Sequence, residues 1–323
     1  MSRILTGIQS SGRPHLANLL GAIIPSIKLS KQNNNESFFF IADLHALTSI
    51  KDPKVRQQNT EAVAAAWIAM GFDTQNNFLY RQSRIPIVNE LSWYLSCLAP
   101  YPMLANAHSF KEKSSKLSDV SVGLFTYPVL MASDILLYDA EFVPVGKDQK
   151  QHLEIVRDLA TTFNNQFGDT LVVPEAIIDE TVMTVPGTDG QKMSKSYNNT
   201  IDIFLPEKDL KKQVMSIVTD SKQLKDPKDP ETDNVYALYK LVASKEQSEA
   251  MHQKYLAGNF GYGHAKNELF SVLIERFKRE RELFNRLMSD PEHIEKTLIE
   301  GESKASAIAH KVINRVRNRL GLA

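Results

Sequence analysis

Two segments of the chain carry residue types that suit the binding and transfer of phosphate groups. Residues 7–18 form a polar, glycine-containing turn, with His15 and Asn18 as side-chain donors where a helix is expected to begin. Residues 192–196 bring Lys192 and Lys195 into one short loop. Backbone N–H groups at a helix start attract phosphate, and lysines stabilise the negative charge that builds on a transferred phosphorus. Each segment alone also fits an ordinary turn or a solvated basic linker.

A third polar segment, residues 146–152, comes between an apolar run and a helical pattern. Its side chains could reach the ribose, amine or carboxylate of a ligand. The alternative is a structural role, in which Asp148 caps the helix and Gln151 completes a capping box. Asp148 could serve both purposes, so this segment adds a candidate site without deciding its ligand.

Asp134 stands in an almost entirely apolar stretch, residues 127–138. A buried carboxylate needs a partner, because losing its hydration costs several kcal/mol. Met131 lies three residues earlier, on the same face of a helix. Together they would line a flat apolar slot with one acceptor at its end, which suits an indole ring and its single N–H. An Arg, a Lys or a backbone amide of the protein is the alternative partner.

The first half of the chain predicts a scaffold in which strands alternate with helices. This alternation indicates a parallel sheet with helices on both faces, and such sheets bind ligands beyond the carboxyl ends of their strands. Pro128 suits the first turn of its helix, because proline has no backbone N–H to donate. The expected strands are residues 3–8, 37–42, 78–80 and 142–145, and the expected helices are residues 16–29, 60–70, 89–98, 128–138 and 148–163.

The second half predicts helices and no strand. We therefore expect an α/β fold, a Rossmann-like parallel sheet with helices on both faces, followed by an all-helical domain. The predicted domains are residues 1–190 and residues 191–302, with the C-terminal helix, about 303–323, packing back on the first domain. The expected helices are residues 207–219, 234–243, 265–288, 292–300 and 304–320.

Bulk composition narrows the classes of function. Cys97 is the only cysteine, which excludes intramolecular disulfides and cysteine-ligated metal sites and favours a reducing, cytoplasmic location. No metal site is expected. Lys plus Arg and Asp plus Glu both number 38, which argues against a nonspecific nucleic-acid binder, so DNA is not an expected partner. We find no apolar stretch that predicts a membrane span and no pattern of a signal peptide, so no membrane partner is expected.

His-Leu-Ala-Asn at residues 15–18 and Lys-Met-Ser-Lys-Ser at residues 192–196 resemble the two signature motifs of class I aminoacyl-tRNA synthetases. The resemblance narrows to bacterial tryptophanyl-tRNA synthetases at residues 126–128, 131–138, 143–146, 148–149 and 152, and it covers almost the whole chain. The resemblance implies activation of L-tryptophan by ATP to tryptophanyl-adenylate and pyrophosphate, followed by transfer to the 3′ end of tRNA(Trp). It also implies Mg²⁺ bound with ATP, a homodimer, and a helical domain that reads the anticodon.

The resemblance also assigns roles to residues. His15, Asn18, Lys192 and Lys195 are expected in catalysis, with both lysines stabilising charge on the α-phosphate. The residues expected to bind ATP are Gln9, Ser10, Ser11, Ala17, Asn18, Gly146, Lys147, Asp148, Val182, Lys192, Met193, Ser194, Lys195 and Ser196. The residues expected to bind tryptophan are Asp134 at the indole N–H, Tyr127 and Gln149 at the amino-acid head group, and Met131 and His45.

Three positions depart from the family pattern. Ala17 stands where glycine is usual, and its methyl group would crowd adenine against the backbone. Ser10 replaces a proline, and Leu5 replaces an aromatic residue near the indole pocket. Two alternatives stay open. Tyrosyl-tRNA synthetases share the fold and both motifs, although Asp134 with Met131 favours indole. The second alternative is a nucleotide-binding paralogue that has lost tRNA charging.

Overall fold

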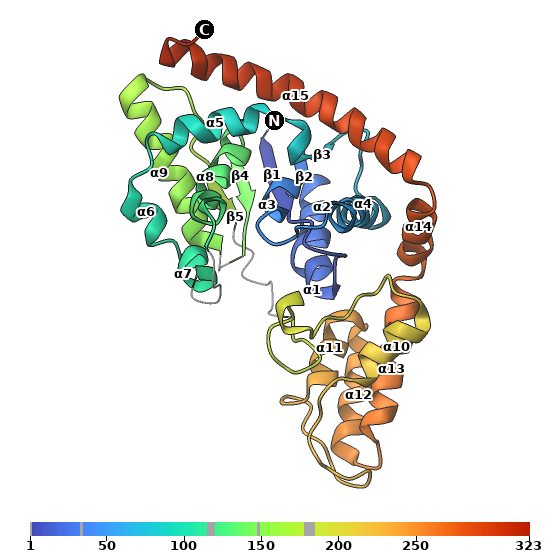
Figure 1. The fold of residues 1–323 in the computed structure, drawn as a ribbon. Coiled ribbons are helices and arrows are strands. Elements are labelled where there is room, and N and C mark those ends of the chain that lie inside the picture. The colour runs from blue at the N-terminus through green and yellow to red at the C-terminus, as the bar shows by residue number, and fades with distance from the viewer. Residues whose placement is uncertain (1, 33–34, 115–119, 147–148, 178–184) are drawn as a thin grey trace. The chain divides into compact units, whose positions relative to one another are not determined.

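The computed structural model describes residues 2–32, 35–114, 120–146, 149–177 and 185–323 (Figure 1). The chain divides into two compact units. Unit 1 comprises Met1–Gly12, Ser26–Thr181 and Asp290–Ala323, and unit 2 comprises Arg13–Pro25 and Val182–Ser289. The sequence analysis drew a boundary near residue 190, and its assignment of functions to the two domains stays a prediction.

Unit 1 is built on a five-stranded sheet in the order β3-β2-β1-β4-β5. Every neighbouring pair of strands is parallel, which confirms the predicted sheet type. β5 escaped the sequence analysis because its three residues are exposed or half-buried and form no apolar run. The strands are β1 (Arg3–Ile8), β2 (Glu36–Ile41), β3 (Phe78–Arg81), β4 (Phe142–Pro144) and β5 (Glu175–Ile177).

Helices of unit 1 cover the sheet and connect its strands. They are α3 (Asp43–Ala46), α4 (Pro53–Ala69), the 3₁₀ turn η2 (Gln82–Arg84), α5 (Ile87–Ser96), α6 (Tyr101–Ala105), α7 (His108–Ser114), α8 (Val122–Leu136), α9 (Lys150–Phe167) and α15 (Pro291–Leu320). α4 begins at a proline, and Asp52 caps it by accepting from the N–H groups of Lys54 and Val55.

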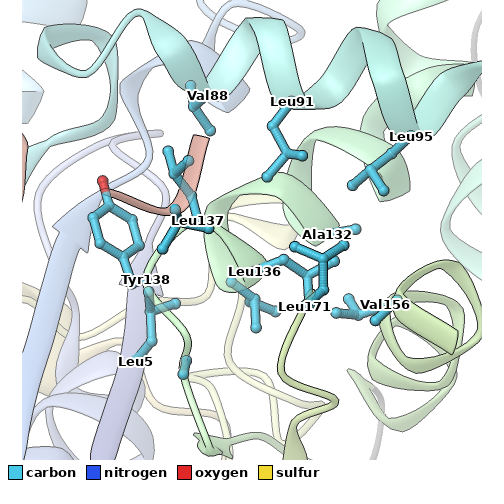
Figure 2. Packing of buried hydrophobic residues seen from close by; sticks show 14 of the residues in the cluster. Leu5, Val88, Leu91, Leu95, Ala132, Leu136, Leu137, Tyr138, Val156 and Leu171 are labelled. Atoms are coloured by element: carbon cyan, nitrogen blue, oxygen red, sulfur yellow. The ribbon is translucent and has the colours of Figure 1, made fainter. Parts of the chain in front are cut away.

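Packing around α8 forms the centre of the unit 1 core. Figure 2 shows Leu91 of α5, Leu5 of β1, and Ala132 and Leu136 of α8 in one buried cluster. These four side chains are at most 1% exposed, so α8 is held on several sides. Asp134 lies on this helix between Ala132 and Leu136, and the surrounding apolar contacts therefore fix its backbone.

The start of α8 corrects one expectation. Pro128 was expected in the first turn, but the helix begins at Val122 and Pro128 lies inside it. Ser121 caps the helix, and its hydroxyl accepts from the backbone N–H of Leu124 at 3.4 Å. An internal proline removes one backbone hydrogen bond. The extensive burial of α8 offsets that loss, and burial of this kind cannot be read from the proline's local sequence.

The C-terminal helix corrects another expectation. Residues 292–300 and 304–320 were expected to form two helices, but α15 is one helix of 30 residues. Gly301 lies against the edge strand β3, where a Cβ atom would stand 1.9 Å from the carbonyl oxygen of Leu79. Gly301, which lies between the two expected helices, therefore permits close packing of α15 on the sheet edge.

Unit 2 is helical, as the sequence analysis predicted for this half of the chain. Residues 265–288, expected as one helix, form two helices that are separated at Phe277. The elements are α1 (Leu16–Asn18), the π-helical turn η1 (Leu19–Ile23), the 3₁₀ turn η4 (Lys195–Tyr197), α10 (Glu207–Met215), α11 (Asn234–Val242), α12 (Lys245–Ala257), α13 (Tyr262–Arg276) and α14 (Lys278–Met288). α2 (Ile24–Ser30) begins at the boundary between the units. Across the described residues, none of the helices combines the length and the apolar character that a membrane crossing requires.

Candidate active site

Asp134 lies at the centre of a buried hydrogen-bonded cluster in unit 1. His45 Nε2 lies 2.9 Å from Asp134 Oδ2, and Gln82 Nε2 lies 2.8 Å from each carboxylate oxygen. All three side chains are at most 4% exposed. Burial raises the pKa of Asp134, and the hydrogen bonds from His45 and Gln82 oppose that rise. The carboxylate is therefore an acceptor that protein donors hold in one orientation.

Adjacent strands of the sheet deliver these donors. His45 lies in α3, just after β2, and Gln82 is the first residue after β3. The carboxyl ends of parallel strands meet at one edge of a sheet, where such folds bind their ligands. Gln82 Oε1 also accepts from the backbone N–H groups of Leu44 at 3.1 Å and His45 at 3.4 Å. The two loops that follow β2 and β3 are thus joined directly to Asp134.

Aromatic rings line the same region. The Tyr127 ring centroid lies 4.3 Å from that of His45 and 6.0 Å from that of His152. Burial raises the pKa of Tyr127 to about 12, and the nearby charge of Asp134 adds to the rise. Met131, one turn from Tyr127 on α8, is partly buried against the core. Aromatic and apolar side chains therefore share this region with His45 and Gln82. Among the described residues, the protein partners of the Asp134 carboxylate are these two side chains, and not the Arg, Lys or backbone amide that the sequence analysis named as the alternative.

The segment after β1 reaches the same cluster. Gln9 Nε2 donates to the backbone carbonyl of His45 at 3.0 Å. Ser10 is fully buried, and its hydroxyl has no hydrogen-bond partner among the described residues. Gln149, at the start of α9, donates its backbone N–H to the carbonyl of Gly146 at 2.9 Å. Gln9 is thus hydrogen-bonded to the backbone of His45, the residue whose ring contacts Asp134.

In unit 2, the turn before α1 is fixed by polar contacts. Asn18 Oδ1 accepts from the backbone N–H of His15 at 3.1 Å. The backbone N–H of Leu16 donates to the carbonyl of Ile201 at 2.8 Å, so the start of α1 is tied to the chain that follows residues 192–196. Ala17 is half-buried in this short helix.

The loop at residues 192–196 is held by the side chain of Asn199. Asn199 Oδ1 accepts from the backbone N–H of Ser194 at 2.7 Å. Asn199 Nδ2 donates to Asp189 Oδ1 at 2.7 Å and to the carbonyl of Lys192 at 3.1 Å. The buried Asn199 amide therefore supplies hydrogen-bond partners to a backbone N–H and a backbone carbonyl of the loop.

Burial, with a smaller contribution from nearby charges, sets the protonation of two candidate catalytic residues in unit 2. Burial lowers the pKa of Lys195 to about 8, and the charge of Asp202 opposes the change. Arg13 Nε lies 3.4 Å from Asp202 Oδ2. Burial, followed by the charge of Lys195, lowers the pKa of His15 to about 4. At pH 7 His15 is therefore neutral, and most molecules carry a protonated Lys195.

The chain as a whole is similar to known proteins. The family model described as tRNA synthetases class I (W and Y) matches residues 1–278. The chain belongs to this family of class I tRNA synthetases. The tryptophan–tRNA ligase of Rhodopirellula baltica is 48% identical over 99% of both chains.

Solved structures of the family agree with this assignment. A tryptophanyl-tRNA synthetase from Campylobacter jejuni, complexed with ADP and tryptophan, is similar with a TM-score of 0.93 and 45% identity, covering 99% of this chain and 100% of that chain. The enzyme from Mycoplasma pneumoniae is similar with a TM-score of 0.84 and 28% identity, covering 100% and 98%. The similarity therefore extends over both units of the synthetase.

Several residues singled out in the sequence lie together in this synthetase. Asp134, His45 and Tyr127 form one cluster in unit 1. In unit 2, the charge of Lys195 adds to the effect of burial in lowering the pKa of His15. Their assignment to tryptophan or ATP stays a prediction. Of the other predicted ATP-binding positions, Lys147, Asp148 and Val182 lie outside the described residues.

The sequence analysis missed three residues at these sites: Gln82, Asn199 and Asp202. Gln82 comes two residues after the strand predicted at residues 78–80, and the expectation that ligands bind beyond the carboxyl ends of parallel strands applies to it. Asn199 and Asp202 carry no such signal, because their importance comes from a turn that folds them back on residues 192–196.

Proposed function

We propose that this chain activates L-tryptophan with ATP, forming tryptophanyl-adenylate and pyrophosphate, and then transfers tryptophan to the 3′ end of tRNA(Trp). The observation that carries the proposal is the buried Asp134 carboxylate, oriented by two donors in aromatic and apolar surroundings. Relatives named tryptophan–tRNA ligase at 42–48% identity support it, as does the similar structure that contains ADP and tryptophan.

In the proposed complex, Asp134 accepts the indole N–H. The flat ring packs on apolar surface that includes Met131 and lies near the His45 imidazole. Tyr127 and Gln149 bind the head group of the amino acid. A buried acceptor of this kind rejects substrates that cannot donate to it, because part of the acceptor capacity of the carboxylate would remain unused in the pocket.

In the proposed reaction, a carboxylate oxygen of tryptophan forms a bond to the α-phosphorus of ATP. The bond from that phosphorus to the bridging oxygen breaks, and pyrophosphate leaves with the electron pair. The positive charges of Lys192 and Lys195 stabilise the negative charge that builds on the phosphate oxygens. The first-turn residues His15 and Asn18 offer donors to the phosphates, and the lowered pKa keeps His15 neutral in this role.

ATP would contact the segment after β1, the start of α1, the start of α9 and the loop at residues 192–196. Lysines dominate that loop, and their charge suits phosphate oxygens rather than a metal ion. Mg²⁺ would accordingly enter with ATP, held mainly by phosphate oxygens and water. The residues proposed here are Gln9, Ser10, Ser11, Ala17, Asn18, Gly146, Lys147, Asp148, Val182, Lys192, Met193, Ser194, Lys195 and Ser196.

Transfer to tRNA completes the proposed cycle. A hydroxyl of the terminal ribose attacks the carbonyl carbon of the adenylate, and AMP leaves. We assign anticodon recognition to the helical unit 2. A cytoplasmic location fits a chain with one cysteine, since reducing compartments keep thiols free.

A homodimer is also part of the proposal. Trp93 on α5, Tyr101 on α6 and Val122 on α8 are 68%, 73% and 76% exposed. α8 packs against both α5 and α6, so these three side chains belong to one connected layer of unit 1. Exposed apolar side chains that form one contiguous patch mark surfaces that bind other proteins, and we propose that these three belong to such a patch. Trp93→Glu should therefore shift a dimer toward monomer in analytical ultracentrifugation. An unchanged sedimenting mass would contradict the proposed dimer surface.

The experiment that tests the function is amino-acid-dependent exchange of labelled pyrophosphate into ATP, run separately with each amino acid. Exchange with tryptophan alone would support the proposal, and charging of tRNA(Trp) transcripts would then test the second step. Exchange with tyrosine alone would identify a tyrosine enzyme. No exchange with any amino acid would point to a paralogue without activation chemistry, and Ala17→Gly would be the first variant to examine.

A further inference from the structure

Gln82 occupies a central place in the unit 1 cluster, although neither signature motif contains it. Its side chain is 2% exposed. Its amide nitrogen lies 2.8 Å from both oxygens of Asp134, and its amide oxygen accepts from the backbone N–H groups of Leu44 and His45. Both ends of the amide are therefore used, and its orientation is determined by the donors on one side and the carboxylate on the other.

The arrangement leaves the two carboxylate oxygens of Asp134 in different states. Oδ2 receives contacts from His45 Nε2 and Gln82 Nε2, whereas Oδ1 receives a contact from Gln82 Nε2 alone among the described hydrogen bonds. An ionised carboxylate offers about four lone-pair sites. Oδ1 thus has more acceptor capacity left than Oδ2.

The backbone that carries Gln82 is itself held firmly. Arg81, the preceding residue, forms bidentate ion pairs with Glu295 at 2.7 and 2.8 Å and with Glu302 at 2.5 and 3.1 Å. Both carboxylates belong to α15, which covers the edge strand β3. Bidentate Arg–carboxylate pairs restrict geometry as well as supplying energy. The backbone next to Gln82 is therefore anchored to α15 at the edge of the sheet.

We infer that Gln82 is a positioning residue for substrate recognition, which holds the Asp134 carboxylate so that its Oδ1 faces the indole N–H. This inference rests on the proposed activation of tryptophan and deepens it. Without Gln82, Asp134 would keep one donor, His45, and could rotate about its terminal bond. The oxygen offered to the substrate would then lose its fixed direction.

The prediction concerns discrimination rather than overall activity. A tryptophan analogue in which sulfur replaces the indole N–H, 3-(3-benzothienyl)alanine, keeps the shape of the substrate and has no hydrogen to donate. If Gln82 acts by aiming Asp134, its removal should weaken the binding of tryptophan while changing that of the analogue little. A merely structural defect would weaken the binding of both compounds equally.

The test is titration calorimetry of both amino acids on the full-length wild type, Gln82→Met and Gln82→Glu. Gln82→Met conserves size and removes both hydrogen-bonding groups. Gln82→Glu keeps an acceptor for the Leu44 and His45 N–H groups and replaces the donor that faces Asp134. We expect the Kd of the analogue divided by the Kd of tryptophan to fall by roughly 10-fold or more in both variants. A fall of this size corresponds to the loss of one hydrogen bond to a charged group.

Asn77→Leu is the matched control. Asn77 is 6% exposed, precedes β3, and clamps backbone groups of Ser37 and Asp73. This variant should lower the thermal midpoint and leave the ratio of Kd values unchanged. If Gln82→Met does not fold, Gln82→Glu decides the question.

The outcomes distinguish a failure of the proposed function from a failure of the positioning role of Gln82. A wild type that neither binds tryptophan nor exchanges pyrophosphate with it would refute the proposed function. A wild type that does both, with Kd ratios in the Gln82 variants equal to its own, would overturn the positioning role alone.

Discussion

Raising the pH from 7 to 9 should remove most of the positive charge from Lys195 before ATP binds. Burial lowers the pKa of this ammonium to about 8, and Asp202 limits the shift. With that pKa, about 90% of Lys195 is protonated at pH 7 and about 10% at pH 9, against nearly full protonation of an ordinary lysine at both. The kcat/KM for ATP should therefore fall about tenfold across this range.

The assay is pyrophosphate exchange at saturating tryptophan, with kcat/KM for ATP measured at half-unit steps of pH. This ratio reports ionisation in the enzyme before ATP binds. Lys195→Arg supplies the control, because guanidinium stays charged at pH 9, and its profile should be flat from pH 7 to 9. Asp202→Asn should move the fall to lower pH, since it removes the carboxylate that favours the charged lysine.

Two results would refute this reasoning. One is a kcat/KM that stays constant from pH 7 to 9 in the wild type. The other is an equal fall in Lys195→Arg, which would assign the titration to another group. Circular dichroism at pH 9 establishes whether the protein remains folded, so that loss of structure is not mistaken for loss of charge.

Three further predictions follow from individual contacts. Asp134→Asn removes the charged acceptor, so kcat/KM for tryptophan in the exchange assay should fall roughly 10- to 100-fold with little change in the KM for ATP; an equal rise in both KM values would contradict the assigned role. Gly301→Ala places a methyl group against the carbonyl of Leu79, so chemical denaturation should show about 1–3 kcal/mol less stability. Gly263→Ala, at a helical glycine with open space where a Cβ atom would lie, should cost no stability. If the two variants were equally stable, the inferred close approach of α15 to β3 would be wrong. Asn199→Ala removes the three hydrogen bonds that the Asn199 amide makes with Ser194, Asp189 and Lys192. It should raise the KM for ATP without altering the Kd of tryptophan. An unchanged KM for ATP would mean that Asn199 does not shape the ATP site.

Much of the fold could be predicted because its signals are local. Four strands showed as short apolar runs, and the alternation of those runs with helical patterns was enough to indicate a parallel sheet. The same alternation predicted that polar residues after the strands would gather at one edge. Asp134 stood out because a carboxylate in an apolar helix requires a partner.

Other features depend on which distant segments meet. Pro128 looked like a helix start, but burial of α8 against α5 and α9 tolerates a proline inside the helix. A break was expected between residues 300 and 304, but α15 continues through it, and Gly301 allows close contact with β3 there. Local patterns favoured a break in both places, and packing outweighed them.

The partners of Asp134 make the same point at the site. His45 is 89 residues away in the chain and Gln82 is 52 residues away, and neither spacing has any periodicity that sequence patterns reveal. Residue types alone could show that a buried carboxylate was present and that it called for a donor. Which donors meet it, and which of its oxygens they leave open, follows from the register of β2 and β3 in the sheet, because that register brings the two loops to the same end of α8.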